Sequence, residues 1–289
     1  MRAGIVTPVL TALPRAHARW ELDAGIAEVE RVVVEAERLG YHHVTCSEHV
    51  AIPDDVAATR GATYWDPLAT FSYLAARTST IRLATFVLVL GYHHPLEIVK
   101  RYGTLDRISG SRLVLGLGVG SLEAEFELLD AAFDDRGARA DDAIRAVRAC
   151  WGHEHPAYRG SHYEIADFVV RPTAGRREVP IWIGGRSRRS LRRAVELGDG
   201  WAPFGLSHTE ISAALDDARA SDAWAARSEP LDVGLQPDPL DPSSDPDGTR
   251  AAVDAARAAG ATTLNLRFVH HSIDHYCEQL DAMRGVLAS

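Results

Sequence analysis

The stretch DRISGSRLVLGLGVGS, residues 106–121, decides the fold of this chain. Its Ser-Gly-Ser triplet at 109–111 is typical of a tight turn after a helix. The apolar run 113–115 that follows is typical of a parallel strand buried on both faces. Gly116, Gly118 and Gly120 then recur with period two and share one face. Because glycine weakens a strand, this face makes room for a flat ligand or another backbone, or it supplies the small residues that a barrel interior needs to close.

Strand-like and helical segments alternate on both sides of this stretch. Repeated βα units indicate a parallel sheet, and eight of them in one chain predict a (β/α)₈ TIM barrel, an α/β fold, with residues 1–289 as a single domain. An open doubly wound sheet is the alternative, but its first strand would carry a glycine fingerprint that residues 1–14 lack. The predicted strands are 2–7, 43–46, 81–89, 113–120, 179–183, 200–202, 231–235 and 262–268, and the helices between them are 22–39, 66–77, 95–108, 187–197, 209–226, 247–259 and 272–287.

A longer segment interrupts this alternation after the fourth strand. We expect Ser121 to cap a helix that runs to residue 132, and a second helix over 141–151. Residues 153–175 read as irregular chain with a hairpin. Long insertions of this kind are usually functional, so we expect this one to close a substrate pocket.

Composition excludes several classes of protein. The chain has 289 residues and a net charge of −9, which argues against nucleic-acid binding. Its three cysteines lie far apart and predict neither a disulfide framework nor a metal site. The first residues lack the apolar core of a signal peptide, and no run is long enough to cross a bilayer. The expectation is a cytoplasmic protein with no membrane partner.

The chemically notable residues fall at the ends of predicted strands, where the active site of such a barrel lies. The second strand delivers Glu48 and His49, the third delivers Thr85, Phe86 and Val87, and the fourth delivers Gly118, Gly120 and Ser121. The fifth ends in Gly184, Gly185, Arg186 and Ser187 before a helix. Free backbone N–H groups and the positive helix end favour a phosphate there, although a Gly-Gly pair is also common in plain loops.

His49 has two interpretations. It is either a hydrogen-bonded structural residue or, beside Glu48, a group that orients a cofactor or moves a proton. The other histidines raise the alternative of a metal site. His153-Glu154-His155 lies in the insertion, however, and adjacent pairs such as His270-His271 point to opposite sides of an extended chain, so no metal ligand is assigned.

The chain resembles the bacterial luciferase-like monooxygenase superfamily, and within it the branch that uses the deazaflavin coenzyme F420. The resemblance extends from about residue 22 to residue 201 and is weak beyond that. No single run is specific, but the runs occur in order. They are LGYHHVTCSEHV (39–50), DPLATFSYLAARTSTIRLAT (66–85), LDRISGSRLVLGLGVGS (105–121), the run from RGARADD to Trp151 (136–151) and VPIWIGGRSRRSLRRAVELGDGW (179–201).

This resemblance implies a barrel with an insertion after the fourth strand and a flavin or deazaflavin lying across the strand ends. Glu48 and His49 would lie beside the ring. Phe86-Val87 would form the bulge, often a non-proline cis peptide, that supports it. The amides of residues 184–186, with Ser187, would hold the phosphate. The resemblance also implies a homodimer and a small-molecule substrate.

The sequence departs from the family at three places. Phe86 stands where relatives usually have Gly, Ser or Cys. Ser121 stands where they have Trp or, in the sugar-phosphate dehydrogenase branch, a proton-donating Glu. His94 precedes Pro95 where an arginine is common. The leading hypothesis is an F420-dependent oxidoreductase. The alternatives are an FMN-dependent monooxygenase that activates O₂, a metal-dependent barrel hydrolase, and a barrel that binds a flavin-like ligand without turnover.

Overall fold

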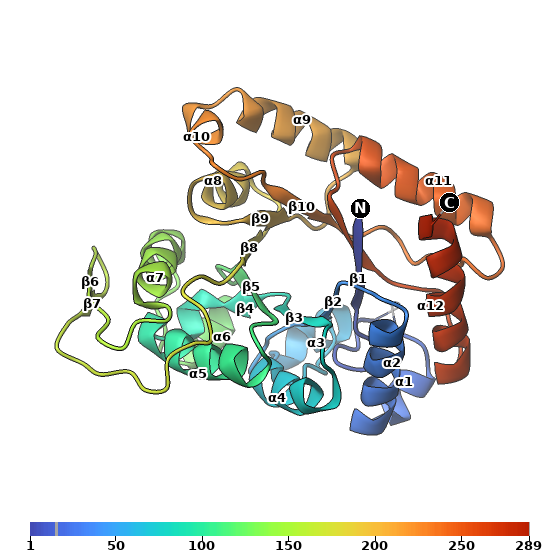
Figure 1. Ribbon diagram of the computed structural model, residues 1–289, viewed down its shortest axis with the longest axis horizontal. Coiled ribbons are helices and arrows are strands. Elements are labelled where there is room, and N and C mark those ends of the chain that lie inside the picture. The colour runs from blue at the N-terminus through green and yellow to red at the C-terminus, as the bar shows by residue number, and fades with distance from the viewer. Residues whose placement is uncertain (15–16, 289) are drawn as a thin grey trace.

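The computed structural model describes residues 1–14 and 17–288, and within them the parallel strands close into a ring with helices outside it (Figure 1). The hydrogen-bonded order is β3-β2-β1-β11-β10-β9-β8-β5-β4, and a pairing of β3 with β5 closes the ring. This is the expected TIM barrel. Its strands are β1 (Arg2–Val6), β2 (His43–Cys46), β3 (Arg82–Thr85), β4 (Leu88–Val89), β5 (Leu113–Gly118), β8 (Ile181–Gly184), β9 (Gly200–Ala202), β10 (Asp232–Leu235) and β11 (Thr263–Leu266).

Helices follow nearly every strand and cover the outside of the ring (Figure 1). Several begin at the residues that the sequence marks as caps. Asp66 accepts a hydrogen bond from the Ala69 N–H at the start of α4, with Pro67 in the first helical position. The helices are α1 (Trp20–Asp23), α2 (Ile26–Arg38), α3 (Asp54–Arg60), α4 (Pro67–Arg77), α5 (Pro95–Ile108), α6 (Glu123–Leu128), α7 (Arg136–Cys150), α8 (Arg188–Leu197), α9 (His208–Arg219), α10 (Asp222–Ala225), α11 (Pro246–Ala258) and α12 (Ile273–Ala288), together with the 3₁₀ turn Leu90–Tyr92.

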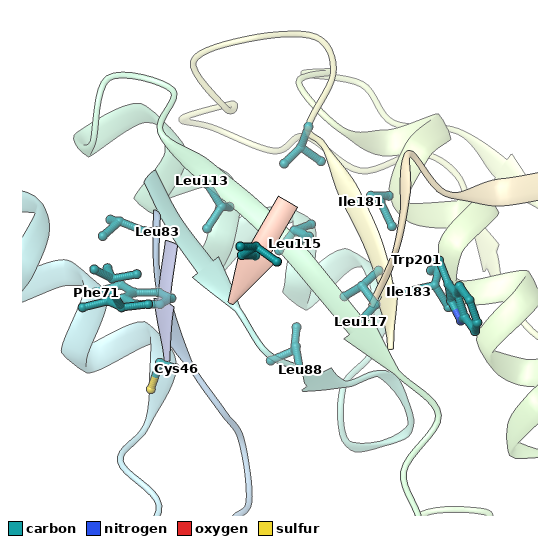
Figure 2. Packing of buried hydrophobic residues seen from close by; sticks show 14 of the residues in the cluster. Cys46, Phe71, Leu83, Leu88, Leu113, Leu115, Leu117, Ile181, Ile183 and Trp201 are labelled. Carbon is teal, nitrogen blue, oxygen red and sulfur yellow. The ribbon is translucent and has the colours of Figure 1, made fainter. Parts of the chain in front are cut away.

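Apolar side chains alternate between the two faces of β5, as the pleat of a strand requires. Leu113, Leu115 and Leu117 belong to the large apolar cluster between strands and helices, part of which Figure 2 shows. Val114 belongs instead to a small separate cluster with Ala84 and Trp182. The continuous apolar run of this strand therefore fills two different cores.

The third predicted strand is interrupted. Residues 81–89 form β3 and β4 with the non-proline cis peptide Phe86-Val87 between them, so the expected cis bond is confirmed. β3 pairs with β5 at Leu83 and Ala84, and β4 pairs with β5 again at Leu88 and Val89. The bulge thus lies at the carboxyl end of β3, where the seam of the barrel closes.

Some local expectations were wrong. Ser121 does not cap a helix: α6 begins at Glu123 after Leu122. The helix expected over 209–226 is two helices, α9 and α10, because Ser221 caps a new start. The sequence analysis did not predict α3. In the insertion, β6 (Tyr158–Arg159) and β7 (Glu164–Ile165) form the expected antiparallel hairpin, while residues 168–170 are not a strand.

Candidate functional site

A cavity of about 590 Å³ opens at the carboxyl ends of β2, β3, β5 and β8, and we call it the main cavity. Its volume lies in the range of small-molecule sites. All four segments that the sequence singled out contribute to its wall, so they converge at one mouth of the barrel. The lining residues are Thr11, Leu13, Ser47, Glu48, His49, Thr59, Arg60, Tyr64, Phe86, Val87, Val89, Gly118, Val119, Gly120, Ser121, Gly184, Gly185, Arg186 and Phe204.

The chain just after β2 holds the bulge in place. The Ser47 hydroxyl donates to the carbonyl of Phe86 at 2.8 Å, and the Glu48 N–H donates to the carbonyl of Val87 at 3.3 Å. The Phe86 N–H in turn donates to the carbonyl of Cys46 at 2.7 Å. Both carbonyls of the bulge and the Phe86 N–H are thereby hydrogen-bonded to residues 46–48, and the Phe86-Val87 peptide lines the main cavity.

Glu48, expected as a catalytic partner of His49, has both carboxylate oxygens occupied. Oε2 accepts from the Val89 N–H at 2.6 Å, and Oε1 lies 2.8 Å from Nε2 of His93. Its side chain is buried. These contacts fix the chain on the far side of the bulge, so Glu48 acts here as a positioning residue.

His49 is paired with Glu125, a residue that the sequence analysis did not single out. Nδ1 of His49 lies 2.7 Å from Oε2 of Glu125. An ionised carboxylate only accepts, so Nδ1 carries the proton and Nε2 is the nitrogen left for a ligand. The ring also packs edge-on against Tyr64, with centroids 4.6 Å apart. His49 is thus oriented by two side chains at the wall of the main cavity.

Glu125 lies on α6, is buried and accepts hydrogen bonds from several groups besides His49. Its carboxylate also accepts from the Tyr92 hydroxyl at 2.6 Å and from the N–H groups of Val50 at 2.6 Å and Ala51 at 3.2 Å. Burial by itself raises the pKa of Glu125, but the hydrogen bonds and the charge of His49 outweigh it and hold that pKa below its usual value. The carboxylate is therefore kept ionised beside His49.

The only sequence signal for Glu125 is its position four residues after Ser121. The resemblance implies a glutamate at the position of Ser121 in the sugar-phosphate dehydrogenase branch, whereas the carboxylate that pairs with His49 in this chain comes four residues later, within α6. Ser121 instead accepts a hydrogen bond from Arg60 on α3 at 3.0 Å. Both residues line the main cavity, so this contact holds the Arg60 guanidinium group at its wall.

The turn after β8 matches the expected phosphate nest in part. Gly184, Gly185 and Arg186 line the main cavity, whereas Ser187 does not. The Ser187 side chain caps α8 by accepting from the Ser190 N–H at 3.2 Å. Among the described residues no acceptor meets the Arg186 N–H, while the Gly185 N–H reaches the carbonyl of Ala202 at 3.4 Å. The free N–H and the side chain of Arg186 are the groups best placed for an anion.

The glycines of β5 make room for neighbouring residues of the chain rather than for a ligand. A Cβ on Gly116 would lie 1.9 Å from the carbonyl oxygen of Thr85, and one on Gly118 would lie 2.5 Å from Cγ2 of Val87. On the other side of the bulge, a Cβ on Gly184 would lie 2.6 Å from Cγ1 of Val87. The shared glycine face therefore makes room for another backbone and its side chain, which is one of the alternatives left open by the sequence.

Two further expectations differ from the structure. Thr85 is fully buried beneath the main cavity, where its hydroxyl donates to the carbonyl of Gly116 at 2.8 Å. No residue of the insertion 152–175 lines the cavity, so the insertion does not close a pocket there. Its hairpin packs on α7 outside the barrel instead (Figure 1). The wall that it was expected to supply comes from other parts of the chain, namely Thr11, Leu13, Thr59, Arg60, Tyr64 and Phe204.

The described residues contain no group of three or more His, Cys, Asp or Glu side chains placed to hold a metal ion. They also include no helix long and apolar enough to cross a membrane. The described residues therefore offer no observation that favours a metal-dependent hydrolase over an enzyme with an organic cofactor.

The closed barrel, the cavity at its strand ends and the non-proline cis peptide beside that cavity are the features expected from the family resemblance. The family model of luciferase-like monooxygenases matches residues 1–275, and the chain belongs to this family. Its relatives include FMNH(2)-dependent monooxygenases and F420-dependent oxidoreductases.

Individual relatives fall on both sides of that division. The FMNH(2)-dependent dimethylsulfone monooxygenase of Pseudomonas fluorescens Pf0-1 is 26% identical over 256 residues, covering 82% of this chain and 68% of the relative. The F420-dependent glucose-6-phosphate dehydrogenase of Intrasporangium calvum is 28% identical over 196 residues, covering 63% and 56%. The monooxygenase RslO1 from Streptomyces bottropensis superposes with a TM-score of 0.80 at 21% identity, covering 100% of this chain and 99% of that one.

Proposed function

We propose that the protein is an F420-dependent oxidoreductase, in which the bound deazaflavin exchanges a hydride at its C5 atom with a small organic substrate. The observation that carries the proposal is the meeting of the Phe86-Val87 peptide, the His49–Glu125 pair and the Gly184–Arg186 turn in one cavity. A flat peptide wall, an imidazole held by a carboxylate and the Gly184–Arg186 turn around one cavity support a site for a tricyclic ring with an anionic tail.

The residues present fit such a group. The peptide bond of Phe86-Val87 would support one face of the ring. This position of the peptide is possible because Gly118 and Gly184 have no side chains that would collide with the methyl groups of Val87. The Arg186 N–H and side chain would hold the phosphate. Arg60, at the same cavity, would meet further negative charge on the F420 tail, which carries carboxylates in addition to its phosphate diester.

His49 would hold a proton at Nε2, facing the ring or the substrate. Because Glu125 keeps Nδ1 protonated, Nε2 can accept a proton in the neutral form and donate one in the charged form. Phe204 and Tyr64 would exclude water from the mouth. The task of the protein is then orientation and desolvation around the cofactor.

A reduced-FMN monooxygenase is the second candidate. In its favour, the dimethylsulfone monooxygenase aligns with a larger share of this chain than the F420-dependent dehydrogenase does, 82% against 63%. The two cofactors share ring and phosphate requirements, so the same cavity would serve either.

Titration of the purified protein with F420 and with FMN, followed by fluorescence, separates the two. We expect F420 to bind with micromolar affinity or better and FMN to bind more weakly. Tight FMN binding with no F420 binding at micromolar concentration overturns the proposal. Oxygen consumption with a flavin reductase present would then test the monooxygenase. Gel filtration would test the homodimer, which stays a prediction.

A further inference from the structure

A second cavity, of about 220 Å³, opens beside the main one at the carboxyl ends of β1, β10 and β11. Phe86 and Val87 line both cavities, which also share Thr11, Leu13, Ser47, Gly184 and Phe204, so the two cavities adjoin at the bulge. A ring lying on the bulge in the main cavity would therefore border the second cavity, which is where a reacting partner would have to bind.

Arg267 is the residue of interest in the second cavity. It directly follows β11 and is half-buried. Among the described residues no carboxylate lies within 4 Å of its guanidinium group, and its buried Nε has no hydrogen-bond acceptor. Burial lowers the pKa of Arg267, and the charge of Asp238 raises it by less. A cation withdrawn from water is normally paired, but Asp238 acts on Arg267 only from beyond ion-pair distance.

The other titratable groups of the second cavity do not supply a counterion. The Glu21 carboxylate is engaged by the N–H groups of Val9 at 2.8 Å and Ala18 at 2.7 Å, and burial raises its pKa. His270 accepts from Trp20 at 3.0 Å, and burial lowers the pKa of His270 to about 4, so it is neutral.

Tyr276 adds a second unsatisfied donor. Its side chain is fully buried at the second cavity, and its hydroxyl has no hydrogen-bond partner in the described part of the chain. Two buried donors without acceptors at one cavity indicate a ligand with acceptor oxygens. The remaining wall is mostly apolar and includes Val6, Pro8 and Phe268.

We propose that the second cavity binds the substrate of the proposed reaction through a carboxylate, with Arg267 as its counterion and Tyr276 as an additional donor. This inference rests on the proposed function for the place of the reacting ring. The substrate is accordingly a small organic acid, whose apolar body extends along Val6 and Phe268 toward the bulge. The size of the cavity suits a body about as large as a benzene ring.

The test is calorimetric titration of the full chain without cofactor. The ligands are acetate, propionate and benzoate, with benzamide as the neutral isostere of benzoate. We expect benzoate to bind and benzamide to bind at least tenfold more weakly. Arg267→Gln should weaken benzoate binding roughly 10- to 100-fold, as expected for loss of a charge-assisted hydrogen bond, and Arg267→Lys should weaken it less.

Arg188→Gln is the matched control, because Arg188 has a strongly exposed side chain on α8 and its removal changes the net charge equally. Equal affinity for benzoate and benzamide, an unchanged affinity in Arg267→Gln, or no binding of any acid below about 10 mM overturns the inference. The comparison of benzoate with benzamide uses the wild-type protein, so it remains informative even if a variant fails to fold. Because the calorimetric titration is done without cofactor, its result does not depend on whether F420 binds.

Discussion

Nδ1 of His49 lies 2.7 Å from Oε2 of Glu125, a residue 76 positions later in the chain. The pair joins the end of β2 to α6 across the mouth of the barrel. Together with the N–H groups of Val50 and Ala51, which also donate to Glu125, it fixes the chain that carries His49.

Replacement of Glu125 by Gln should lower both activity and stability. The variant keeps the shape but loses the ionised acceptor of four hydrogen bonds, so we expect a loss of about 1–3 kcal/mol in the free energy of unfolding. Because the pKa of Glu125 is held low in the fold, its contribution is present above the usual glutamate pKa of 4.5 and is lost as pH falls through the lowered value. Urea unfolding between pH 3 and 7 measures this, and a pH dependence equal to that of the wild type would contradict it.

The His93–Glu48 contact should have the opposite pH dependence. Burial lowers the pKa of His93, but the hydrogen bond and the charge of Glu48 together raise it by more than burial lowers it. The net pKa is therefore above the usual 6.5. The stabilisation is fully present below pH 6.5 and is lost as pH rises through the raised value. His93→Gln should abolish that decline in the free energy of unfolding, whereas His155→Gln, at an exposed position, should keep it.

Alanine at Gly118 should disturb the bulge. Its Cβ would lie 2.5 Å from Cγ2 of Val87, so we expect a cost of about 1–3 kcal/mol and weaker cofactor binding. The double variant Gly118→Ala/Val87→Ala should recover part of that cost, because the colliding methyl groups are gone. Gly285→Ala is the control, since no atom lies within 4 Å of its Cβ in α12 and alanine there should stabilise by about 0.5–1 kcal/mol. Thermal unfolding without any recovery in the double variant would refute the contact.

Arg60 and Arg186 should each contribute to holding an anionic cofactor. Glutamine at either position should weaken F420 binding several-fold, and the loss should shrink at high salt because both side chains are solvent-accessible at the cavity. A fluorescence titration at two ionic strengths measures both effects. Arg188→Gln, which leaves the cavity unchanged, sets the baseline for loss of one positive charge.

The hairpin of the insertion should be dispensable for cofactor binding. Asp142 on α7 holds it by accepting from the Tyr158 hydroxyl at 2.5 Å and the His162 N–H at 2.7 Å. Asp142→Ala should therefore increase proteolysis of residues 158–165 while leaving the dissociation constant of F420 unchanged. A weakened affinity would mean that the insertion reaches the cofactor after all.

The sequence predicted the barrel because each strand is marked locally. The β5 stretch carries its turn, apolar run and glycines within 16 residues, and Asp66-Pro67 and Ser187 specify helix starts that the structure contains. It also predicted that the strand ends would converge, since all carboxyl ends of a parallel barrel face one mouth. The family resemblance located the cis peptide.

Other parts of the site could not be predicted from local pattern. Glu125 lies on a short helix that begins after Leu122 rather than after the predicted cap Ser121, and its partners come from the chain after β2 and from the turn after β4. Arg60 lies on α3, a helix of seven residues without an apolar stripe of buried side chains. Such contacts depend on how distant loops fold over the barrel mouth, which sequence periodicity does not report.

Phe86 lines both cavities, at a position where the family resemblance implies a smaller side chain. Any replacement there resizes the room for the ring and the room for its reaction partner in one step. A single substitution of Phe86 should therefore change the affinity for the cofactor and the affinity for the substrate together.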